Sequence, residues 1–314
     1  QKTAYEIYQC DWSSDVCSSD LRLLDRFSKG IRAAPADALT ADLSEKDEYA
    51  SNFAFRQTLC SCGAILGSLV TIGIMLISNN NYRLVFWLSL LPASIALALL
   101  IFAIKPNPST HPRNNASYSG KKNSFNYKDF SKFSLEFWWL LFAFFFLMMA
   151  RFSEAFLTLQ AKNVGFSPAF LPAMIIIMDL AHAVIAIPSG KLADKENRQK
   201  MLSYGMMVIL IAQVTIFYST TVTGFIVGII LVGLHMGITQ GLLKALIAQC
   251  TPAELRGTAF SIFFIISGVA IFLGNVIAGK LSHMYGTNTA FLGGAVFSFI
   301  AIFLLSIGCD KKNF

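Results

Sequence analysis

Several apolar runs of this 314-residue chain contain ionisable side chains, which are costly inside a membrane and usually mark a path for ions or solutes. Arg151 and Glu154 are three residues apart, so we expect them to share one helix face. A partly desolvated carboxylate there could exchange a proton while the arginine balances its charge or binds an anion. The alternative is a structural salt bridge that fixes helix packing. The candidates for transport or coupling are Arg151, Glu154, Asp179, His182, Asp25, Arg26 and Gln240.

The sequence does not indicate an enzyme. It has no HExxH or DxxD motif and no Ser/His/Asp series near a membrane boundary, and its six cysteines form no pair of CxxC motifs. We therefore expect no catalytic residue, no metal and no cofactor. For His182 and His235, a hydrogen-bonded packing role is the alternative to ligand binding.

Composition places the charged candidates in a polytopic membrane protein. The chain is 55% hydrophobic and 14% charged, whereas soluble domains carry about 25% charged residues. Eight apolar runs are long enough to cross a bilayer, and each is predicted to be helical because lipid offers no partner for backbone groups. The runs are continuous rather than alternating, which excludes a β-barrel. Their approximate bounds are 53–77, 84–104, 135–159, 169–188, 201–218, 222–247, 258–281 and 289–308.

Positive charges gather on alternate connections between these runs. Segments 105–134 and 190–200 carry many of the lysines and arginines, and Lys311 and Lys312 follow the last run. The positive-inside rule therefore places these connections and the C-terminus in the cytoplasm. The net charge of +7 forms no basic patch with interleaved aromatics, so nucleic acid is not expected as a partner. Segment 105–134 is predicted to be a flexible cytoplasmic linker between two helical bundles.

An internal repeat relates the beginning of the chain to its last third. Gly30-Ile31 matches Gly237-Ile238, and Asp37-Ala38-Leu39 matches Lys244-Ala245-Leu246, at a spacing of about 205–207 residues. A unit of that length cannot fit before residue 105, so we expect helices to be missing from the N-terminal side.

The repeat predicts an all-α protein of twelve helices in two six-helix bundles. This chain would then hold the end of the fourth helix through the twelfth, about nine helices in all. Residues 22–104 are assigned to the C-terminal part of the first bundle, and residues 135–314 to the second bundle.

The segment GKLADKENRQK at 190–200 resembles the loop motif of the major facilitator superfamily, with matches at Gly190, Leu192, Ala193, Asp194, Lys195 and Arg198. The resemblance implies that this motif acts as a conformational gate. We expect Asp194 to accept hydrogen bonds from the N-terminus of the helix that begins near Ser51–Phe53, where the helix dipole favours an anion. Arg56 is the expected charge partner. Asn197 replaces a glycine, and we interpret it as a residue in left-handed conformation.

A second match lies at RLLDRFSKGIRAAPADALTADL, which resembles the fourth-helix motif of one bacterial branch of that superfamily. The structural alternative for this charged segment is an interfacial amphipathic helix. In the next helix, Ser68 stands where the family's antiporter motif has proline, which weakens an antiport interpretation. The glycines expected to pack against other helices are Gly30, Gly63, Gly67 and Gly268.

Residues 1–21 resemble neither motif. They can be back-translated, in frame, into the two halves of a short-read sequencing adapter separated by a gap of index length. We therefore expect residues 1–21 to be a translated library artefact that is absent from the native gene.

The resemblance to the superfamily covers residues 22–314 and implies a secondary active transporter of the bacterial inner membrane. Such a protein would move a small organic solute by alternating access, with protons as the candidate coupling ion. The implied partners are the lipid bilayer and the small-molecule substrate, and a monomer is expected. The alternative is a membrane sensor or scaffold that kept the fold without transporting. Asp25 competes with Glu154 for the coupling role.

Overall fold

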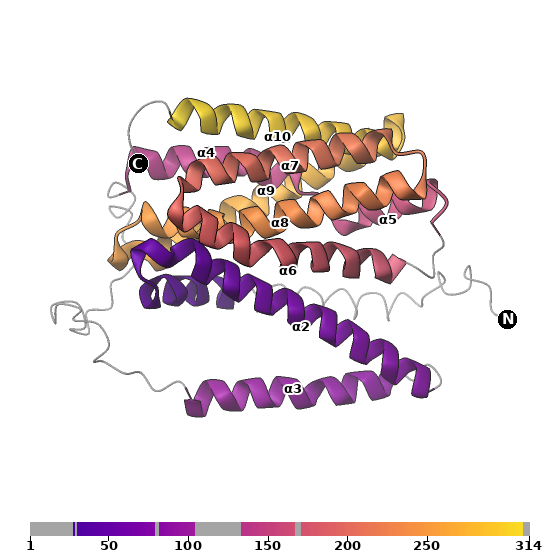
Figure 1. The fold of residues 1–314 in the computed structure, drawn as a ribbon, viewed down its shortest axis with the longest axis horizontal. Coiled ribbons are helices and arrows are strands. Elements are labelled where there is room, and N and C mark those ends of the chain that lie inside the picture. Colours follow the sequence, from indigo (N-terminus) through magenta and orange to yellow (C-terminus); the bar gives the residue numbers. More distant parts are fainter. Residues whose placement is uncertain (1–27, 29, 79–81, 104–132, 167–170, 310–314) are drawn as a thin grey trace. The chain divides into compact units, whose positions relative to one another are not determined.

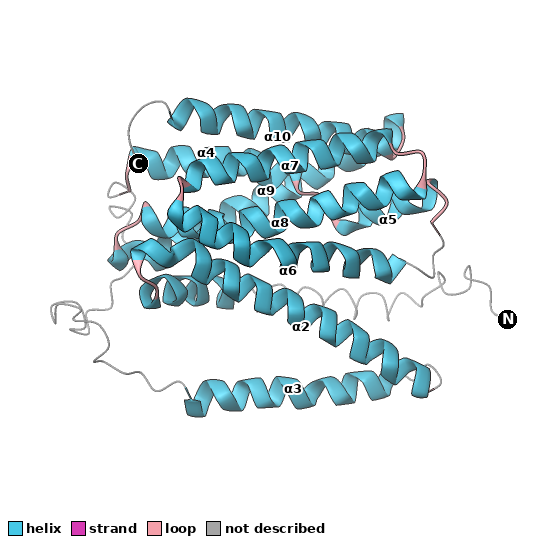
Figure 2. Ribbon diagram, viewed as in Figure 1, coloured by secondary structure: helices cyan, strands magenta, loops and turns pink. Residues whose placement is uncertain are grey.

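The computed structural model describes residues 28, 30–78, 82–103, 133–166 and 171–309. Every element drawn in these ranges is a helix (Figure 2), which confirms the predicted all-α class. Residues 30–43 are helical, and the labelled helices are α2 (Tyr49–Ile77), α3 (Tyr82–Ala103), α4 (Leu135–Ala150), α5 (Glu154–Asn163), α6 (Leu171–Lys195), α7 (Arg198–Tyr218), α8 (Val222–Gln249), α9 (Arg256–Tyr285) and α10 (Asn288–Cys309), with short 3-10 turns η1 (Lys46–Glu48) and η4 (Ala253–Leu255).

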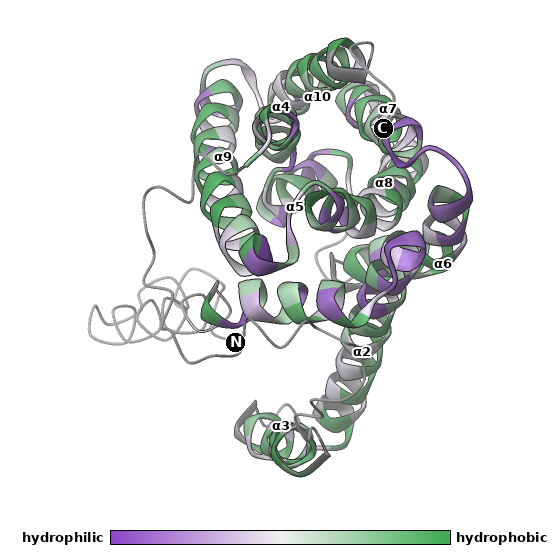
Figure 3. Cartoon of the chain, turned by 90° about the vertical axis from the view of Figure 1, so that its left-hand side faces the viewer, coloured by the Kyte–Doolittle hydropathy of each residue, from purple (hydrophilic) through white to green (hydrophobic). Residues whose placement is uncertain are grey.

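Seven helices within the described residues are long and apolar enough to cross a membrane, and Leu84–Leu99 is a shorter apolar helix. Large apolar side chains such as Val184, Phe272 and Phe299 are exposed on their outer surfaces. Hydrophobic residues dominate the helices when they are viewed end-on (Figure 3). This pattern suits a surface that faces lipid instead of water. The numbering of the helices from four to twelve stays a prediction, as does the linker, most of which lies outside the described residues.

The described chain divides into two compact units, which we treat separately. One holds the residues up to Leu59 and those from Phe133 onward; the other begins at Cys60 and contains the rest of α2 and all of α3. In the second unit, Pro92 lies inside α3. Membrane helices tolerate an internal proline because neighbouring groups can satisfy the freed backbone carbonyl.

In the larger unit, each helix of the bundle packs against the next in the order α6, α8, α7, α10, α4 and α9 (Figure 1). One apolar cluster joins α4, α8 and α9 to the 30–53 segment through side chains such as Phe53, Phe137 and Phe260. A second cluster surrounds α5, where Leu157 packs with residues of α6, α7, α8 and α10 such as Phe291. The second cluster holds α5 inside the bundle.

The run predicted as one helix over 135–159 is broken. Helix α4 ends at Ala150, and α5 begins at Glu154 after Ser153, which caps it. Arg151 adopts φ −90° and ψ 89°, which no α-helix contains. Arg151 and Glu154 therefore do not share one helix face, and the expectation that they do is wrong. Hydropathy missed the break because the residues on both sides remain apolar.

Close helix packing depends on other glycines than those predicted. No described atom lies within 4 Å of a Cβ built on Gly30 or Gly268, and the same holds for Gly63 and Gly67 in the smaller unit. In contrast, three glycines of α8 follow one another at four-residue spacing, and a Cβ on each would meet a neighbouring helix. These glycines are Gly233 against Met178, Gly237 against His182 and Gly241 against Ala54. Such small residues let helix backbones approach closely in membranes.

Candidate functional site

A cavity of about 660 Å³ lies beside the break between α4 and α5. Its wall contains ten apolar residues, among them Phe152, Met236 and Phe291. Six polar residues complete the lining: Arg151, Ser153, Glu154, Gln213, His235 and Asn275. Binding sites for small molecules have this size and this mainly apolar lining with a few polar groups.

Two amides from distant helices satisfy the backbone groups that the break exposes. Gln213 of α7 donates from Nε2 to the carbonyl oxygen of Ala150 at 2.7 Å. The backbone N–H of Ser153 donates to Oδ1 of Asn275 on α9 at 2.9 Å. Without Gln213, the carbonyl of the buried Ala150 would be unsatisfied in an apolar environment, which costs several kcal/mol in a membrane. The break is therefore a supported feature of the fold and positions the cavity.

The break places the charged side chains of Arg151 and Glu154 at helix ends of opposite dipole sign. Arg151 follows the C-terminus of α4, where the helix dipole is negative, and Glu154 begins α5, where the dipole is positive. Neither side chain has a hydrogen bond or an ion pair within the described residues. Arg151 is half-buried and lies within electrostatic range of His182 and His235. The two opposite charges are therefore both presented to the cavity without neutralising each other.

The remaining predicted candidates lie around this region in different ways. Asp179 of α6 is half-buried and within electrostatic range of Glu154. His182 is 2% exposed, and Gln240 is half-buried on α8. Asp25 and Arg26 lie outside the described residues. None of the three described residues, Asp179, His182 and Gln240, lines the cavity.

Gln213 offers a direct test of the break. We expect Gln213→Leu to lower the free energy of unfolding by about 1–3 kcal/mol, because the Ala150 carbonyl would lose its donor in a buried site. The measurement is thermal unfolding of the purified protein in detergent. Thr215→Val, on the same helix, is the control, since the half-buried Thr215 hydroxyl bonds only its own helix. Equal stability of both variants would contradict the assigned role.

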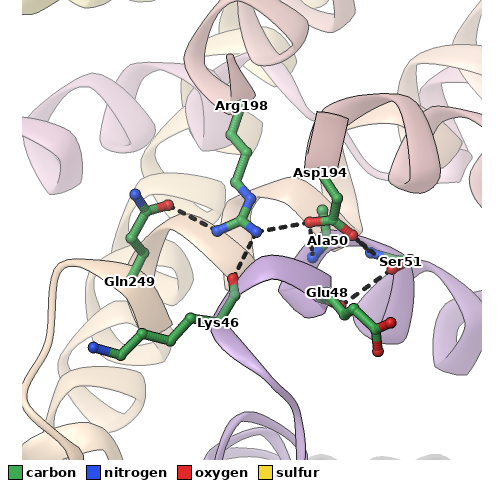
Figure 4. A network of polar contacts seen from close by, with 7 residues as sticks. All are labelled: Lys46, Glu48, Ala50, Ser51, Asp194, Arg198 and Gln249. Carbon is green, nitrogen blue, oxygen red and sulfur yellow. Dashed lines mark hydrogen bonds and ion pairs between the residues drawn. The ribbon is translucent and has the colours of Figure 1, made fainter. Parts of the chain in front are cut away.

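A second polar site lies where α6 and α7 meet the start of α2 (Figure 4). The Asp194 carboxylate accepts hydrogen bonds from the backbone N–H groups of Ala50 and Ser51, at 3.0 and 2.7 Å, and from the Ser51 hydroxyl at 2.5 Å. Arg198 pairs with the same carboxylate at 2.7 Å. The predicted contact between Asp194 and a helix N-terminus is therefore present.

Arg198 extends this site to two further segments. Its Nη2 donates to the carbonyl oxygen of Lys46 at 2.7 Å, and its Nη1 donates to Oε1 of Gln249 at 2.9 Å. We call the residues Lys46, Ala50, Ser51, Asp194, Arg198 and Gln249 the Asp194 network. The network ties the end of α6 to α2 and to the end of α8, so any separation of these helices must break charge-assisted hydrogen bonds.

Two neighbours of Asp194 differ from their predicted roles. Arg56 is not its charge partner; Arg56 pairs instead with the buried carboxylate of Asp37. Asn197 has φ −73°, so it is not left-handed, and its side chain caps α7 by accepting the N–H of Gln199 at 2.9 Å. Lys195 is exposed and has no ion pair within the described residues. Gly190 lies where a Cβ would stand 2.6 Å from Cβ of Ala54, so its small size lets α6 approach α2.

Residues 30–56 make further charged contacts with α8 and α9. Lys244 pairs with Asp37 at 3.1 Å, and Arg256 pairs with Asp42 at 2.8 Å. Arg256 also donates to the Tyr49 hydroxyl. The Tyr49 ring lies near two guanidinium groups, 5.8 Å from Arg198 and 5.5 Å from Arg256, which favours a cation–π contribution.

Several of these residues were absent from the predicted site. Gln213 and Asn275 were missed although each is a lone amide in an apolar run, which is a readable signal. Lys244 and Arg256 appeared in the sequence only as flanking charges. Their partners could not be read from the sequence because they lie more than 200 residues away.

A sequence profile described as Major Facilitator Superfamily matches residues 21–178 and 140–313. The chain is 26% identical over 285 residues to an uncharacterized MFS-type transporter of Methanocaldococcus jannaschii, covering 88% of this chain and 70% of that protein. It is 23% identical over 291 residues to the inner membrane transport protein YajR of Escherichia coli, covering 90% of this chain and 61% of that protein. The chain thus spans only part of these relatives.

Solved structures give a similar result. The human organic anion transporter MFSD10 has a TM-score of 0.65 at 17% identity, with 87% of this chain and 67% of that chain covered. The Escherichia coli fucose:proton symporter FucP has a TM-score of 0.70 at 14% identity, with 89% and 73% covered. At these identities, the likeness shows the fold alone.

Proposed function

The chain belongs to the major facilitator superfamily, a family of membrane transporters, and we propose that it moves a small organic solute by alternating access coupled to protons. The observation that carries this proposal is the cavity of about 660 Å³ beside the α4–α5 break, with two charged side chains in its lining. Ionisable groups inside the membrane are costly and usually serve a substrate or ion path, and transporters commonly form such sites at discontinuous helices.

The Asp194 network supplies the second part of the proposal. Alternating access requires contacts that hold one conformation and can be released. In this proposal the network, with the Asp37–Lys244 pair, closes one end of the protein. We further propose that this end faces the cytoplasm, as the positive-inside pattern of segment 190–200 predicts.

Glu154 is the proposed coupling residue. It lines the cavity, it is exposed there, and it lacks an ion pair within the described residues, so its charge is free to respond to a proton or a solute. Asp179, a half-buried acidic residue of α6, is the second candidate for this role within the described residues.

The test is solute-driven proton movement in proteoliposomes that contain the full-length protein and the pH dye pyranine. Monosaccharides, amino acids and aryl carboxylates are added outside as the solute panel. We expect one of these three solute classes to change the pH inside the proteoliposomes, because the solute crosses the membrane together with protons. A panel that produces neither proton movement nor counterflow of labelled solute would favour the sensor or scaffold alternative.

We expect Glu154→Gln to abolish accumulation driven by a pH gradient while solute counterflow continues, because glutamine keeps the shape of the side chain and cannot exchange a proton. Glu254→Gln, an exposed change in η4, is the control and should retain accumulation. If Glu154→Gln still accumulates solute along the pH gradient, Glu154 is structural. The coupling role would then pass to Asp25 or Asp179.

A further inference from the structure

The polar groups of the cavity are not equally available to a ligand. Gln213 and Asn275 support the helix break, and each uses both ends of its amide. His235 is fully buried and is held between the Gly205 carbonyl, at 2.8 Å, and Thr239. The hydroxyl of Ser153 caps α5. Four of the six polar residues are therefore occupied by the fold itself.

Arg151 and Glu154 are the two that remain. A guanidinium presents five donors and accepts nothing, so an unpaired arginine in a mainly apolar cavity calls for an anionic acceptor. Glu154 differs because its side chain is exposed, so water can solvate the carboxylate, whereas the Arg151 side chain is half-buried. Arg151 is therefore the cavity residue that most needs a partner of opposite charge, which a negatively charged ligand would provide.

The apolar residues of the cavity wall indicate the chemistry of the remaining part of the ligand. Phe152, Met236 and Phe291 line the space with apolar side chains, and methionine and aromatic residues adapt to flat or irregular apolar bodies. From this arrangement we infer that the transported solute is an amphipathic organic anion whose acidic group binds Arg151 and whose apolar body fills the cavity. The inference rests on the proposed function, since it names the class of solute that the same cavity takes.

A charge series of equal shape tests the inference. The probes are 2-naphthoate, 2-naphthylmethylamine and 2-naphthalenemethanol, which carry a negative, a positive and no charge on the same apolar body. Each is titrated against the full-length protein in phosphatidylcholine nanodiscs, and binding is read from the shift of the thermal unfolding temperature. We expect 2-naphthoate to stabilise the protein more strongly than the other two probes.

Two substitutions at Arg151 and one matched control complete the test. Arg151→Gln should weaken 2-naphthoate binding by about ten- to a hundredfold, because a hydrogen-bonded charge pair is lost. Arg151→Lys should retain part of the affinity, since it keeps the charge without the two-pronged geometry. Lys162→Gln, an exposed change at the other end of α5, should bind as the unaltered protein does. Equal binding of the three probes, or full 2-naphthoate binding by Arg151→Gln, would overturn the inference.

The result is separable from the proposed function. If proton-coupled transport of a neutral or cationic solute is found while 2-naphthoate neither binds nor competes, the inference fails and the transporter stands. If 2-naphthoate binds through Arg151 but no solute moves, the anion site stands and transport fails. Displacement of 2-naphthoate by phosphatidylglycerol added to the nanodiscs would assign the site to a lipid headgroup and overturn the assignment to a transported solute.

Discussion

Asp194→Asn is expected to open the Asp194 network and to accelerate alkylation of Cys250 by about tenfold or more at neutral pH. The asparagine keeps the shape of the side chain but removes the charge that Ala50, Ser51 and Arg198 share. Hydrogen bonds to a charged group contribute about 1.5–3 kcal/mol each. Their loss shifts the balance toward a conformation in which α2 has moved away from α6.

Cys250 reports this opening because it follows α8 directly after Gln249, a member of the network. Burial, with the nearby Glu136 carboxylate as a smaller cause, raises the pKa of the Cys250 thiol to about 11. Only the thiolate reacts, so the closed protein is protected well below that pH. Exposure to water would bring the pKa back toward about 8.5 and increase the thiolate fraction at pH 7.5.

The measurement uses a variant in which Cys250 is the sole cysteine, treated with N-ethylmaleimide and followed by mass spectrometry. Lys195→Gln changes a charge in the same turn without touching an ion pair of the described residues, and it should leave the rate unchanged. In the full-length protein, the proposed alternating-access function predicts that Asp194→Asn also reduces solute flux, because the state that the network closes would be less populated. An unchanged alkylation rate would show that the network does not hold the closed state.

Gly237→Val is expected to prevent folding of the larger unit. A Cβ at this position would stand 2.6 Å from the carbonyl oxygen of His182 and would also meet Ile185. The His182 carbonyl belongs to the backbone of α6 and cannot turn away as a side chain can. Overpacking alone costs about 1–3 kcal/mol, and the branched valine adds two methyl groups to the clash.

Gly268→Val is the matched control, because no described atom lies within 4 Å of its Cβ position and the residue is exposed. We expect this control to elute as a single peak in size-exclusion chromatography. Gly237→Val should give aggregate or no protein. A monodisperse Gly237→Val protein with unchanged thermal stability would show that α6 and α8 can separate without loss of the fold.

The sequence predicted features that depend on local pattern and failed where a distant partner decides. The charged segment at 190–200 led correctly to the contact between Asp194 and a helix N-terminus, because the positive end of the helix dipole favours a carboxylate. It did not identify Arg198 as the partner of Asp194, although the four-residue spacing was readable. Arg56 was predicted to be that partner, but Arg56 forms its ion pair with Asp37, which lies in a segment of low hydropathy.

The broken helix could not be predicted from hydropathy. A hydropathy average over this segment stays high in spite of Arg151 and Glu154. The side chains that satisfy the backbone groups at the break, Gln213 and Asn275, lie on other helices. The packing glycines show the opposite case. Gly233, Gly237 and Gly241 repeat at four-residue spacing, which is the recognisable pattern for close helix approach. For the predicted Gly268, no described atom lies within 4 Å of the Cβ position.

The ion pair between Asp37 and Lys244 joins two positions that the internal repeat relates. In an assembly of two identical subunits, a residue on the twofold axis faces its own copy, so an acidic residue there would meet an acidic one. In a single chain that carries both copies, as the sequence repeat predicts, the two equivalent positions can carry different residues. One copy can then supply the acid, Asp37, and the other the base, Lys244.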